Sequence, residues 1–479
     1  MTHELLAITI YVAILFLIGF LSYRKQQTAN DFLIGGRSLN YWLTAMAAHA
    51  SDMSSWLFMG FPAVIFIGGL FNTWFAVGLC VFMFLNWLVV APRVRIQTEK
   101  YNSLTFSSFF ESHFHDTSGM IRIFTAVISF IFYSIYISAG IVGLGILVQS
   151  LFGIDYHIGI SVGILVVIPY LFIGGYTTLA WIDLFQGVFL LLVIIAVPLL
   201  VLPQVGGWTG IISAASAHGI SLSMIPNTHP KTLWMIFFSI CGWGIGYFGQ
   251  PHIITKFMGI RKVSHIKKSM AVGMTWQIIA LGSATLIGLI GIAYFTNGLA
   301  DSELVFVKMV EEVFHPFIIA LILCAVLGAT ISTMDSQILV LASSLTEDFY
   351  KRIFHKNATS KQLLWVSRLF ILLVTAFAYL IAFFKVSTIY SLVFFAWSGL
   401  GSAFGPLLIF CLYSKKANKY GAWGGIIVGA VVALVWPLID KHLSVNIPTL
   451  VPGFLLSSLA IIALSYFTRH KHHHAHTNH

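Results

Sequence analysis

The sequence predicts an all-α integral membrane protein with about 13 transmembrane helices. Of its 479 residues, 58% are hydrophobic and only 9% are charged, and the mean hydropathy is +0.91. A soluble domain carries roughly one-quarter charged residues, so a soluble enzyme, a disordered chain and a fibrous protein are excluded. The 40 glycines and the 15% of aromatic residues are typical of closely packed membrane helices with aromatic interfaces.

Thirteen apolar runs are each long enough to span a bilayer core, which takes roughly 20 helical residues. The run near the N-terminus has no basic leader and no clear cleavage site, so we expect a membrane helix there and not a signal peptide. Counts between ten and fourteen fit the same runs, and the loops near 93–120 and 204–231 are too short for a soluble domain. The predicted spans are 5–23, 40–70, 73–92, 121–150, 157–175, 179–203, 232–257, 271–296, 315–347, 362–384, 388–412, 421–438 and 447–467.

The net charge of +10 is distributed unevenly between the predicted loops. With the N-terminus outside, all but four of the 26 Lys and Arg residues, Lys256 included, fall on the inner side, as the positive-inside rule requires. We therefore predict a multi-pass cell-membrane protein, in a bacterial inner membrane, with the N-terminus outside and the C-terminus cytoplasmic. The outer lysines are Lys231, Lys308, Lys385 and Lys441, and the acidic residues Asp301, Glu303, Glu311 and Glu312 lie on the same side.

Neither the cysteines nor the histidine-rich tail predicts a metal site. The cysteines lie singly in apolar segments, so we expect buried thiols without disulfides. For the tail, a solvated segment or an expression remnant is favoured over metal binding, because nothing fixes a coordination geometry. The cysteines are Cys80, Cys241, Cys324 and Cys411, and the tail histidines are His470, His472, His473, His474, His476 and His479.

Three acidic residues, Asp52, Asp183 and Asp335, lie well inside predicted spans. A charge at mid-bilayer costs roughly 2.5–3.5 kcal/mol on insertion scales, so each needs a partner, a wet cavity or a proton. One such residue is as readily a hydrogen-bonded structural acid as a functional one. Three in one bundle favour a path for an ion or a solute.

A break is expected in the second span, where the run Ala50–Ser55 is mostly small or polar. Such residues weaken a helix and compete for its backbone groups, and a break would free carbonyls to bind a hard cation. A polar seam between packed helices is the alternative. The neighbouring His49 is interpreted as a hydrogen-bonded packing residue, since no second histidine lies one turn away.

A second break is expected in the seventh span, where Gly242–Pro251 holds four glycines and a proline. Trp243, Tyr247 and Gln250 project from this weak point and offer two aromatic walls and one amide to a solute. A glycine-packed helix contact is the alternative, and it explains the glycines but not the Gln-Pro end.

The two breaks are five helices apart, which predicts two inverted five-helix repeats, each with a discontinuous helix. The first helix and the last two are then peripheral. The predicted divisions are 1–39 (first helix and cytoplasmic loop), 40–203 (first repeat), 204–412 (second repeat with its leading external loop), 413–467 (two peripheral helices) and 468–479 (histidine-rich cytoplasmic tail).

The ninth span carries a polar face, because Ala329, Ser332, Thr333 and Ser336 recur at helical spacing and Asp335 flanks them. Hard cations prefer oxygen ligands. The Ala329 carbonyl and the two hydroxyls at Ser332 and Thr333 could form half of a cation cage, with carbonyls near Ala50 and Met53 as the other half. Back-bonding of the hydroxyls to the preceding turn is the alternative.

Taken together, these segments resemble the solute:sodium symporters, and within them the sodium/proline symporters. The resemblance covers about 8–464. It is carried by Gly35-Gly-Arg-Ser-Leu39, Ala50-Ser-Asp-Met-Ser54, Gly242-Trp-Gly-Ile-Gly-Tyr-Phe-Gly-Gln-Pro-His252 and Ser332-Thr333 through Thr346-Glu-Asp-Phe-Tyr350.

The resemblance implies a LeuT-like core of two inverted five-helix repeats and specific site residues. The sodium site is expected from the carbonyls of Ala50, Met53 and Ala329 and the hydroxyls of Ser332 and Thr333, with Asp52 beside it as the coupling residue. A second sodium, as some relatives bind, would use Asp183, Asp335 and Ser336 next to Ser332; gating or packing is the alternative role of the two acids. The substrate pocket is expected from Ser54, Trp56, Gly60, Tyr136, Trp243, Tyr247, Gln250 and Pro251.

The expected function is secondary active transport, namely sodium-coupled symport of L-proline into the cell by alternating access. The expected partners are proline or a similar small solute, co-transported sodium and the lipid bilayer, with no nucleic acid and no enzymatic activity. The rivals are another amino acid or small carboxylate as substrate, a proton in place of sodium, or a membrane sensor, enzyme or channel. Two broken helices in matching repeat positions favour alternating access over a channel.

Overall fold

The structure is a computed structural model that describes residues 2–22, 29–173 and 175–473. Within these ranges every regular element is a helix, apart from one isolated parallel bridge between Leu39 and Ile260, which confirms the predicted all-α class. The first ten α-helices are α1 (Thr2–Ser22), α2 (Ala29–Ile34), α3 (Tyr41–Met53), α4 (Gly60–Gly68), α5 (Trp74–Leu85), α6 (Ala91–Lys100), α7 (Phe106–His113), α8 (Met120–Phe152), α9 (Tyr156–Ile173) and α10 (Gly175–Val201).

The second half of the chain continues the same bundle. Its helices are α11 (Gly207–Ala217), α12 (Pro230–Gly244), α13 (Pro251–Met258), α14 (Ile266–Tyr294), α15 (Val305–Val313), α16 (Pro316–Ser344), α17 (Ser360–Phe383), α18 (Ile389–Tyr413), α19 (Lys419–Asp440) and α20 (Leu450–His473).

Eleven helical stretches in the described residues are long and apolar enough to cross a membrane. One of them, Ser55–Lys100, runs through α4, α5 and α6, and α9 contributes only a shorter apolar run, Tyr156–Leu165. The multi-pass architecture is therefore confirmed, whereas the number of thirteen spans stays a prediction.

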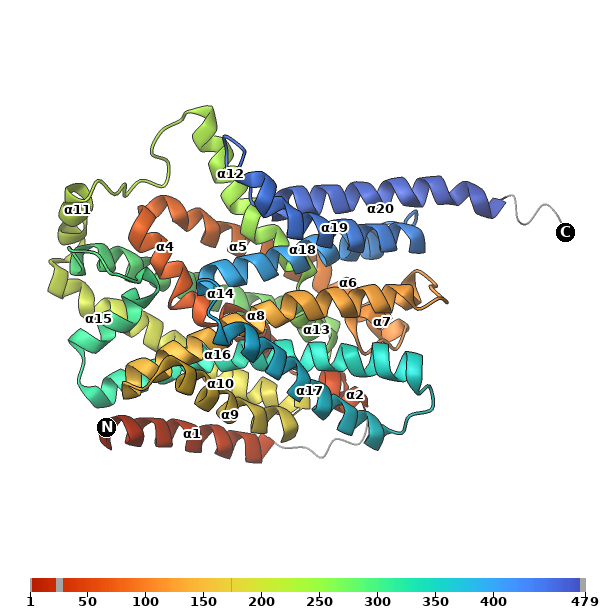
Figure 1. The fold of residues 1–479 in the computed structure, drawn as a ribbon, viewed down its shortest axis with the longest axis horizontal. Coiled ribbons are helices and arrows are strands. Elements are labelled where there is room, and N and C mark those ends of the chain that lie inside the picture. Colours follow the sequence, from red (N-terminus) through yellow and green to blue (C-terminus); the bar gives the residue numbers. More distant parts are fainter. Residues whose placement is uncertain (1, 23–28, 174, 474–479) are drawn as a thin grey trace.

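Helices at the centre of the bundle are mostly buried, whereas helices at its rim are mostly exposed. The most apolar window of α8 is 89% buried, whereas that of α1 is only 17% buried. Exposed leucines and phenylalanines on an outer helix suit a hydrocarbon solvent, since backbone groups are satisfied within the helix and only apolar side chains face outward. Figure 1 shows α1 along one edge of the bundle and α19 and α20 along the opposite edge.

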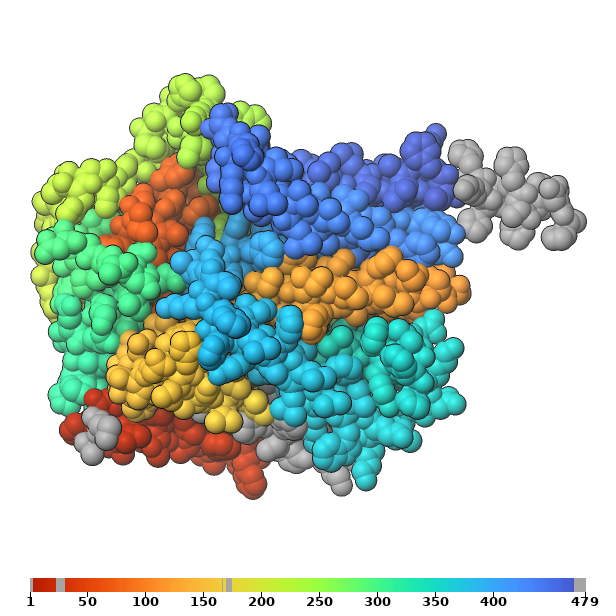
Figure 2. Space-filling model, in the orientation of Figure 1, coloured from red at the N-terminus to blue at the C-terminus, as the bar shows by residue number. Residues whose placement is uncertain are grey.

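The long axes of the large helices run in one common direction, so the bundle has two ends. In Figure 1, α11 and α15 lie at one end, and α6, α7 and the C-terminal end of α20 lie at the other. Figure 2 shows the same arrangement with side chains, with α19 and α20 forming an outer ridge along one edge of the bundle.

Several details differ from the sequence prediction. The loops near 93–120 and 204–231 contain α7 and α11, and α6 extends the third span to Lys100. Lys256, counted among the inner loop charges, is buried, and so is Glu303 of the acidic outer loop, because each has polar partners inside the bundle. Cys241, Cys324 and Cys411 are buried, but Cys80 is partly exposed.

Half of the predicted tail 468–479 lies outside the described residues. Helix α20 reaches His473, and His474, His476 and His479 lie outside the described residues.

Candidate functional site

The second span is broken at Ser54, as the sequence predicts. Ser54 has φ 49° and ψ −164°, which ends α3 at Met53, and a short 3₁₀ turn (Ser55–Leu57) leads to α4. The Ser54 hydroxyl accepts the Trp56 N–H at 3.2 Å and so stabilises the turn. A helix end leaves its last carbonyls without helical donors, and here the orphaned carbonyls belong to the segment from Ala50 to Met53.

The seventh span is broken at Gln250, also as predicted. Helix α12 passes into a 3₁₀ segment (Ile245–Gly249), Gln250 is extended at φ −96° and ψ 101°, and Pro251 opens α13. The Gln250 amide nitrogen donates to the carbonyls of Gly246 at 3.2 Å and Trp397 at 3.1 Å. Gln250 therefore holds the break together and attaches it to α18.

The glycines of this break also serve close packing. A Cβ at Gly246 would come within 2.1 Å of the Trp397 indole nitrogen, and one at Gly249 within 2.6 Å of the Gly405 nitrogen. The two interpretations of this motif, a break and a glycine-packed contact, are thus both correct, because the glycines let α18 approach the broken backbone.

A short hydrogen bond joins the two broken helices. The Tyr247 hydroxyl donates to Asp52 Oδ2 at 2.5 Å, and the Gln277 amide donates to the Tyr247 oxygen at 3.3 Å. Tyr247 is fully buried and Asp52 is 5% exposed. The carboxylate near the first break is therefore partnered by a phenol from the second.

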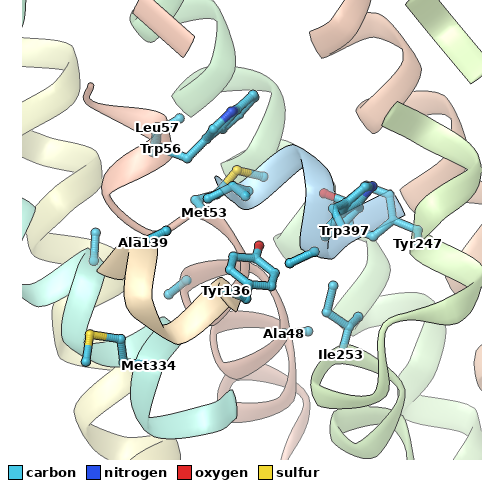
Figure 3. Packing of buried hydrophobic residues seen from close by; sticks show 14 of the residues in the cluster. Ala48, Met53, Trp56, Leu57, Tyr136, Ala139, Tyr247, Ile253, Met334 and Trp397 are labelled. Carbon is cyan, nitrogen blue, oxygen red and sulfur yellow. The ribbon is translucent and has the colours of Figure 1, made fainter. Parts of the chain in front are cut away.

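A small cavity lies between the breaks and holds about 250 Å³ of space not filled by atoms. Figure 3 shows Met53, Tyr136, Tyr247 and Trp397 around this space. The full lining is Asp52, Met53, Trp56, Leu79, Tyr136, Trp243, Tyr247, Val393 and Trp397.

Aromatic rings form most of the wall. The Trp56 and Trp243 rings are 5.0 Å apart between centroids, and Tyr247 meets Trp397 edge to face at 5.0 Å. The Trp56 indole N–H is buried and has no hydrogen-bond partner among the described residues. The cavity thus has flat apolar walls and one carboxyl group, and the wall residue Trp56 has an unused indole N–H.

The predicted pocket residues divide into two groups. Trp56, Tyr136, Trp243 and Tyr247 line the cavity. The others, Ser54, Gly60, Gln250 and Pro251, lie at the ends of the broken helices and do not line it; Ser54 and Gln250 form the turns themselves.

Of the predicted cation ligands on α16, Thr333 contacts the end of α3 and Ser332 contacts α10. Thr333 Oγ1 accepts the Ser54 N–H at 3.0 Å and donates to the Ala329 carbonyl at 3.0 Å. Ser332 Oγ instead donates to Asp183 Oδ1 on α10 at 2.6 Å. Ala50, Met53 and Ala329 are all buried in the same core. Back-bonding, the alternative for these hydroxyls, thus describes Thr333 in part but not Ser332.

The second group of acids contains a cation that the sequence prediction did not assign to it. Lys256 Nζ on α13 lies 3.7 Å from Asp183 Oδ2 and donates to Ser336 Oγ at 3.0 Å. Asp335 is buried beside them and interacts electrostatically with both Asp183 and Lys256. The signal that could have found it is a lysine inside a predicted membrane span, which requires a partner by the same rule as the acids.

His49 is a packing residue, as predicted. It is fully buried, its Nε2 accepts the Trp87 indole N–H at 2.9 Å, and the two rings stack with centroids 5.9 Å apart. It fills the space between α3 and the π-helical turn at Asn86–Val90.

One end of the bundle is fastened by the motif Gly35–Leu39. Gly35, Gly36 and Arg37 all have positive φ, between 54° and 62°. The Arg37 guanidinium donates to three carbonyls, those of Met258 at 2.9 Å and of Thr98 and Ser103 at 3.0 Å. The Leu39 backbone pairs with the strand-like end of α13 through Leu39–Gly259 and Arg261–Leu39 bonds at 3.2 and 2.8 Å.

The opposite end is fastened by Glu303. Its carboxylate accepts the backbone N–H groups of Ile389 at 3.0 Å and Tyr390 at 2.8 Å, which opens α18 with a negative cap. Burial raises the pKa of Glu303, and these two hydrogen bonds oppose the rise. Tyr390 in turn accepts the Trp243 indole N–H at 3.3 Å, so the cap is connected to the cavity wall.

Comparison with known proteins identifies the family. The sequence pattern of the sodium:solute symporter family matches residues 32–429. The chain is 38% identical over 457 residues to the high-affinity proline transporter PutP of Bacillus subtilis, covering 95% of this chain and 96% of that protein. It is 35% identical to the sodium/proline symporter of Escherichia coli, covering 97% and 93%.

The fold also matches solved transporters. A substrate-bound, outward-open Na⁺-coupled sialic acid symporter superposes with a TM-score of 0.82 at 18% identity, covering 97% of this chain and 98% of that one. MhsT in complex with L-phenylalanine gives 0.57 at 13% identity, covering 88% and 97%. These matches confirm the predicted LeuT-like core with its two broken helices. By its sequence, the chain belongs to the sodium:solute symporter family.

Proposed function

We propose that this protein is a secondary active transporter that carries L-proline into the cell together with sodium. The observation that carries the proposal is the pair of broken helices whose ends meet around a small aromatic cavity, beside a cluster of oxygen ligands. Relatives that match over almost the whole chain are named as proline transporters and sodium/proline symporters.

The sodium ion is proposed to bind between α3 and α16. The carbonyls of Ala50 and Met53 belong to the last turn of α3. The hydrogen bond of 3.0 Å from the Ser54 N–H to Thr333 Oγ1, which holds α16 against that turn, supports this location. Neutral oxygens suit a weakly held monovalent ion. The proposed ligands are Ala50, Met53, Ala329, Ser332 and Thr333, with Asp52 setting the field beside them.

Proline is proposed to bind in the aromatic cavity. Its pyrrolidine ring would pack against Trp56, Trp243 and Tyr247, and its carboxylate would accept the unused Trp56 indole N–H. Tyr136 lines the same space. Ser54, Gly60, Gln250 and Pro251 contribute by shaping the broken backbone and not by lining the cavity.

The energy available from sodium is sufficient for accumulation. A membrane potential of about 100 mV supplies roughly 2.3 kcal/mol per charge. A tenfold sodium gradient adds about 1.4 kcal/mol, so one sodium could concentrate a neutral solute on the order of several-hundredfold.

Uptake of labelled proline into proteoliposomes tests the proposal. We expect accumulation when a sodium gradient points inward and equilibration only when it is absent. A proton gradient that replaces sodium would change the coupling ion, and accumulation of another amino acid or small carboxylate in preference to proline would change the substrate. Facilitated flux that never exceeds equilibrium under any ion gradient would overturn coupled transport.

The orientation is proposed to be N-terminus outside and C-terminus cytoplasmic. The distribution of basic residues between the loops supports this orientation. Lys231 lies in the first turn of α12 and Lys262 in the loop after α13, so the two exposed residues flank the predicted seventh span on opposite sides. A cysteine at Lys231 should react with an impermeant thiol reagent from outside, and a cysteine at Lys262 only from inside. The reverse labelling pattern would overturn the orientation.

A further inference from the structure

Lys256 stands among the oxygens that were predicted to hold a second sodium. Its side chain is 3% exposed and that of Asp183 is 2% exposed, so the pair is almost completely removed from solvent. The ammonium lies 3.7 Å from Asp183 Oδ2, donates to Ser336 Oγ at 3.0 Å, and lies 5.0 Å from the centre of the Tyr176 ring. A hydroxyl, a carboxylate and an aromatic face thus surround one positive charge.

The oxygens of this cluster still have unused capacity. Asp183 Oδ1 accepts the Ser332 hydroxyl at 2.6 Å, but Asp183 Oδ2 and Asp335 Oδ1 are buried without a hydrogen-bond partner in the part of the chain that the structure describes. Both acids interact electrostatically with Lys256. Asp183 and Ser336 therefore contact the ammonium directly, Ser332 is held against Asp183, and Asp335 is a second buried acid whose charge acts on the same group.

Sodium and an ammonium group satisfy such a cluster in similar ways. Each brings one positive charge that oxygen atoms surround, and each offsets the cost of holding a carboxylate away from water. They differ because the ammonium is tethered to α13 and cannot be released. A buried carboxylate that loses its partner is strongly destabilised, which gives a free cation a reason to enter.

We propose that the Lys256 ammonium acts as a built-in second cation, so that this transporter couples proline to a single sodium. Without the ammonium, Asp183, Asp335, Ser332 and Ser336 form a site that a second sodium fills. This inference rests on the proposed sodium coupling. Lys256 is a positioning residue that sets the number of transported ions, and it touches neither the proposed sodium nor the cavity lining.

The Lys256→Met variant tests this inference in proteoliposomes. The ratio of ²²Na to labelled proline taken up should be one for the wild type and two for Lys256→Met, and the Hill coefficient for sodium should rise from about 1 towards 2. Lys256→Arg keeps the charge and should keep the ratio of one. The double variant Lys256→Met/Asp183→Asn removes both charges and should also keep it. A ratio of one in Lys256→Met would overturn the proposal.

If Lys256 and Asp183 form only a structural ion pair and do not affect sodium binding, a different result is expected. In that case Lys256→Met would be less stable to the same degree at every sodium concentration. Under the proposal, the melting temperature of purified Lys256→Met should rise more steeply with sodium than that of the wild type, because a second ion binds the folded state. Parallel sodium dependence of the two proteins would overturn it.

A measurement on the wild type keeps the inference open to refutation if the variant does not fold. Equilibrium ²²Na binding to purified wild-type protein without proline should saturate at one ion per chain, and saturation at two would overturn the proposal. If wild-type uptake does not depend on sodium at all, the proposed coupling fails and not the role of Lys256, so the two failures are distinguishable.

Discussion

The two broken helices are interrupted by different backbone conformations and lie in opposite chemical surroundings. The break at Ser54 is made by one serine with positive φ, and its N–H is bound by the Thr333 hydroxyl of α16. The break at Gln250 is made by a 3₁₀ turn, an extended residue and a proline, and it packs against Trp397 of α18.

The neighbouring helix therefore decides what each break can bind. Around Ser54, α16 and α10 supply hydroxyls and carboxylates; around Gln250, α18 supplies an indole and glycine contacts. An interrupted helix alone specifies neither an ion nor a solute. Its exposed carbonyls become a cation site only where other oxygens face them.

The two regions are also connected. We call the region around Ser54 the polar side and the region around Gln250 the aromatic side. Tyr247, on the aromatic side, donates to Asp52 on the polar side. Trp56 follows the first break yet packs on Trp243 from the second. This connection is what coupled transport requires, because binding in one region must alter the other.

The largest expected effect comes from removing oxygens on the polar side. Each hydroxyl bond contributes roughly 0.5–1.5 kcal/mol, and up to about 3 kcal/mol with a charged partner. The double change Ser332→Ala/Thr333→Ala should therefore raise the sodium concentration for half-maximal proline uptake about thirtyfold or more.

The matched control for that variant is Thr330→Ala. Thr330 lies on the same helix and is equally buried, but its hydroxyl donates to the Val326 carbonyl at 2.8 Å. It should leave sodium activation within about twofold. If the double variant reaches the membrane and its sodium activation is unchanged, the assignment of Ser332 and Thr333 as sodium ligands is contradicted.

The next effect is expected on the aromatic side. Trp243→Ala and Tyr247→Ala each remove a large contact surface, worth about 1–3 kcal/mol, so proline affinity should fall roughly tenfold to a hundredfold. Sodium binding measured without proline should change much less. Trp276→Ala is a control, since Trp276 is 3% exposed and donates to the Gly187 carbonyl away from the cavity lining. Folded Trp243→Ala with normal proline affinity would contradict the solute assignment.

A smaller and more selective effect is expected at the connection itself. Tyr247→Phe keeps the ring but removes the hydroxyl that donates to Asp52. Each ligand should still bind alone, whereas the enhancement of proline affinity by sodium should fall by up to about tenfold. Titrations of proline with and without sodium measure this enhancement. Tyr133→Phe, which removes a buried hydroxyl that contacts His252, should preserve it; an undiminished enhancement in Tyr247→Phe would locate the coupling elsewhere.

The smallest effect concerns pH at the Glu303 cap of α18. The pKa of Glu303 in the fold is raised above its ordinary value of 4.5 because the carboxylate is buried. Its contribution to stability is therefore fully present below about pH 4.5 and is lost as the pH rises through the folded pKa. The melting temperature of the wild type relative to Glu303→Gln should fall between pH 4 and pH 7. A difference that is constant with pH would contradict this.

The fold was largely predictable from the sequence because membrane helices are long apolar runs and the breaks are marked locally. Gly242–Pro251 combines glycines and a proline, and Ala50–Ser55 consists mostly of small or polar residues. Both interruptions can therefore be predicted from a few consecutive residues. The all-helical class and both breaks followed. The exact number of spans did not, since apolar content alone does not divide a run such as Ser55–Lys100.

The rest of the site depended on contacts between distant segments. Trp397 lies on the cavity, whereas Trp365 is 61% exposed, and nothing local in an apolar run separates the two. Lys256 is 73 positions from Asp183 and meets it only through the packing of α13 on the bundle. Gln250 was expected to face the solute, but its amide holds two backbone carbonyls of the break.

The motif Gly35–Leu39 has a consequence for how this chain can diverge. Leu39 holds the segment after α13 through backbone atoms alone, so another apolar residue that fills its buried position can keep the attachment. Gly35 has no such freedom, because its φ is +62° and a Cβ would lie 2.9 Å from the Thr177 hydroxyl. Arg37 is equally constrained, since one guanidinium serves three separate segments. Natural variants should therefore accumulate at Leu39 and be rare two and four positions before it.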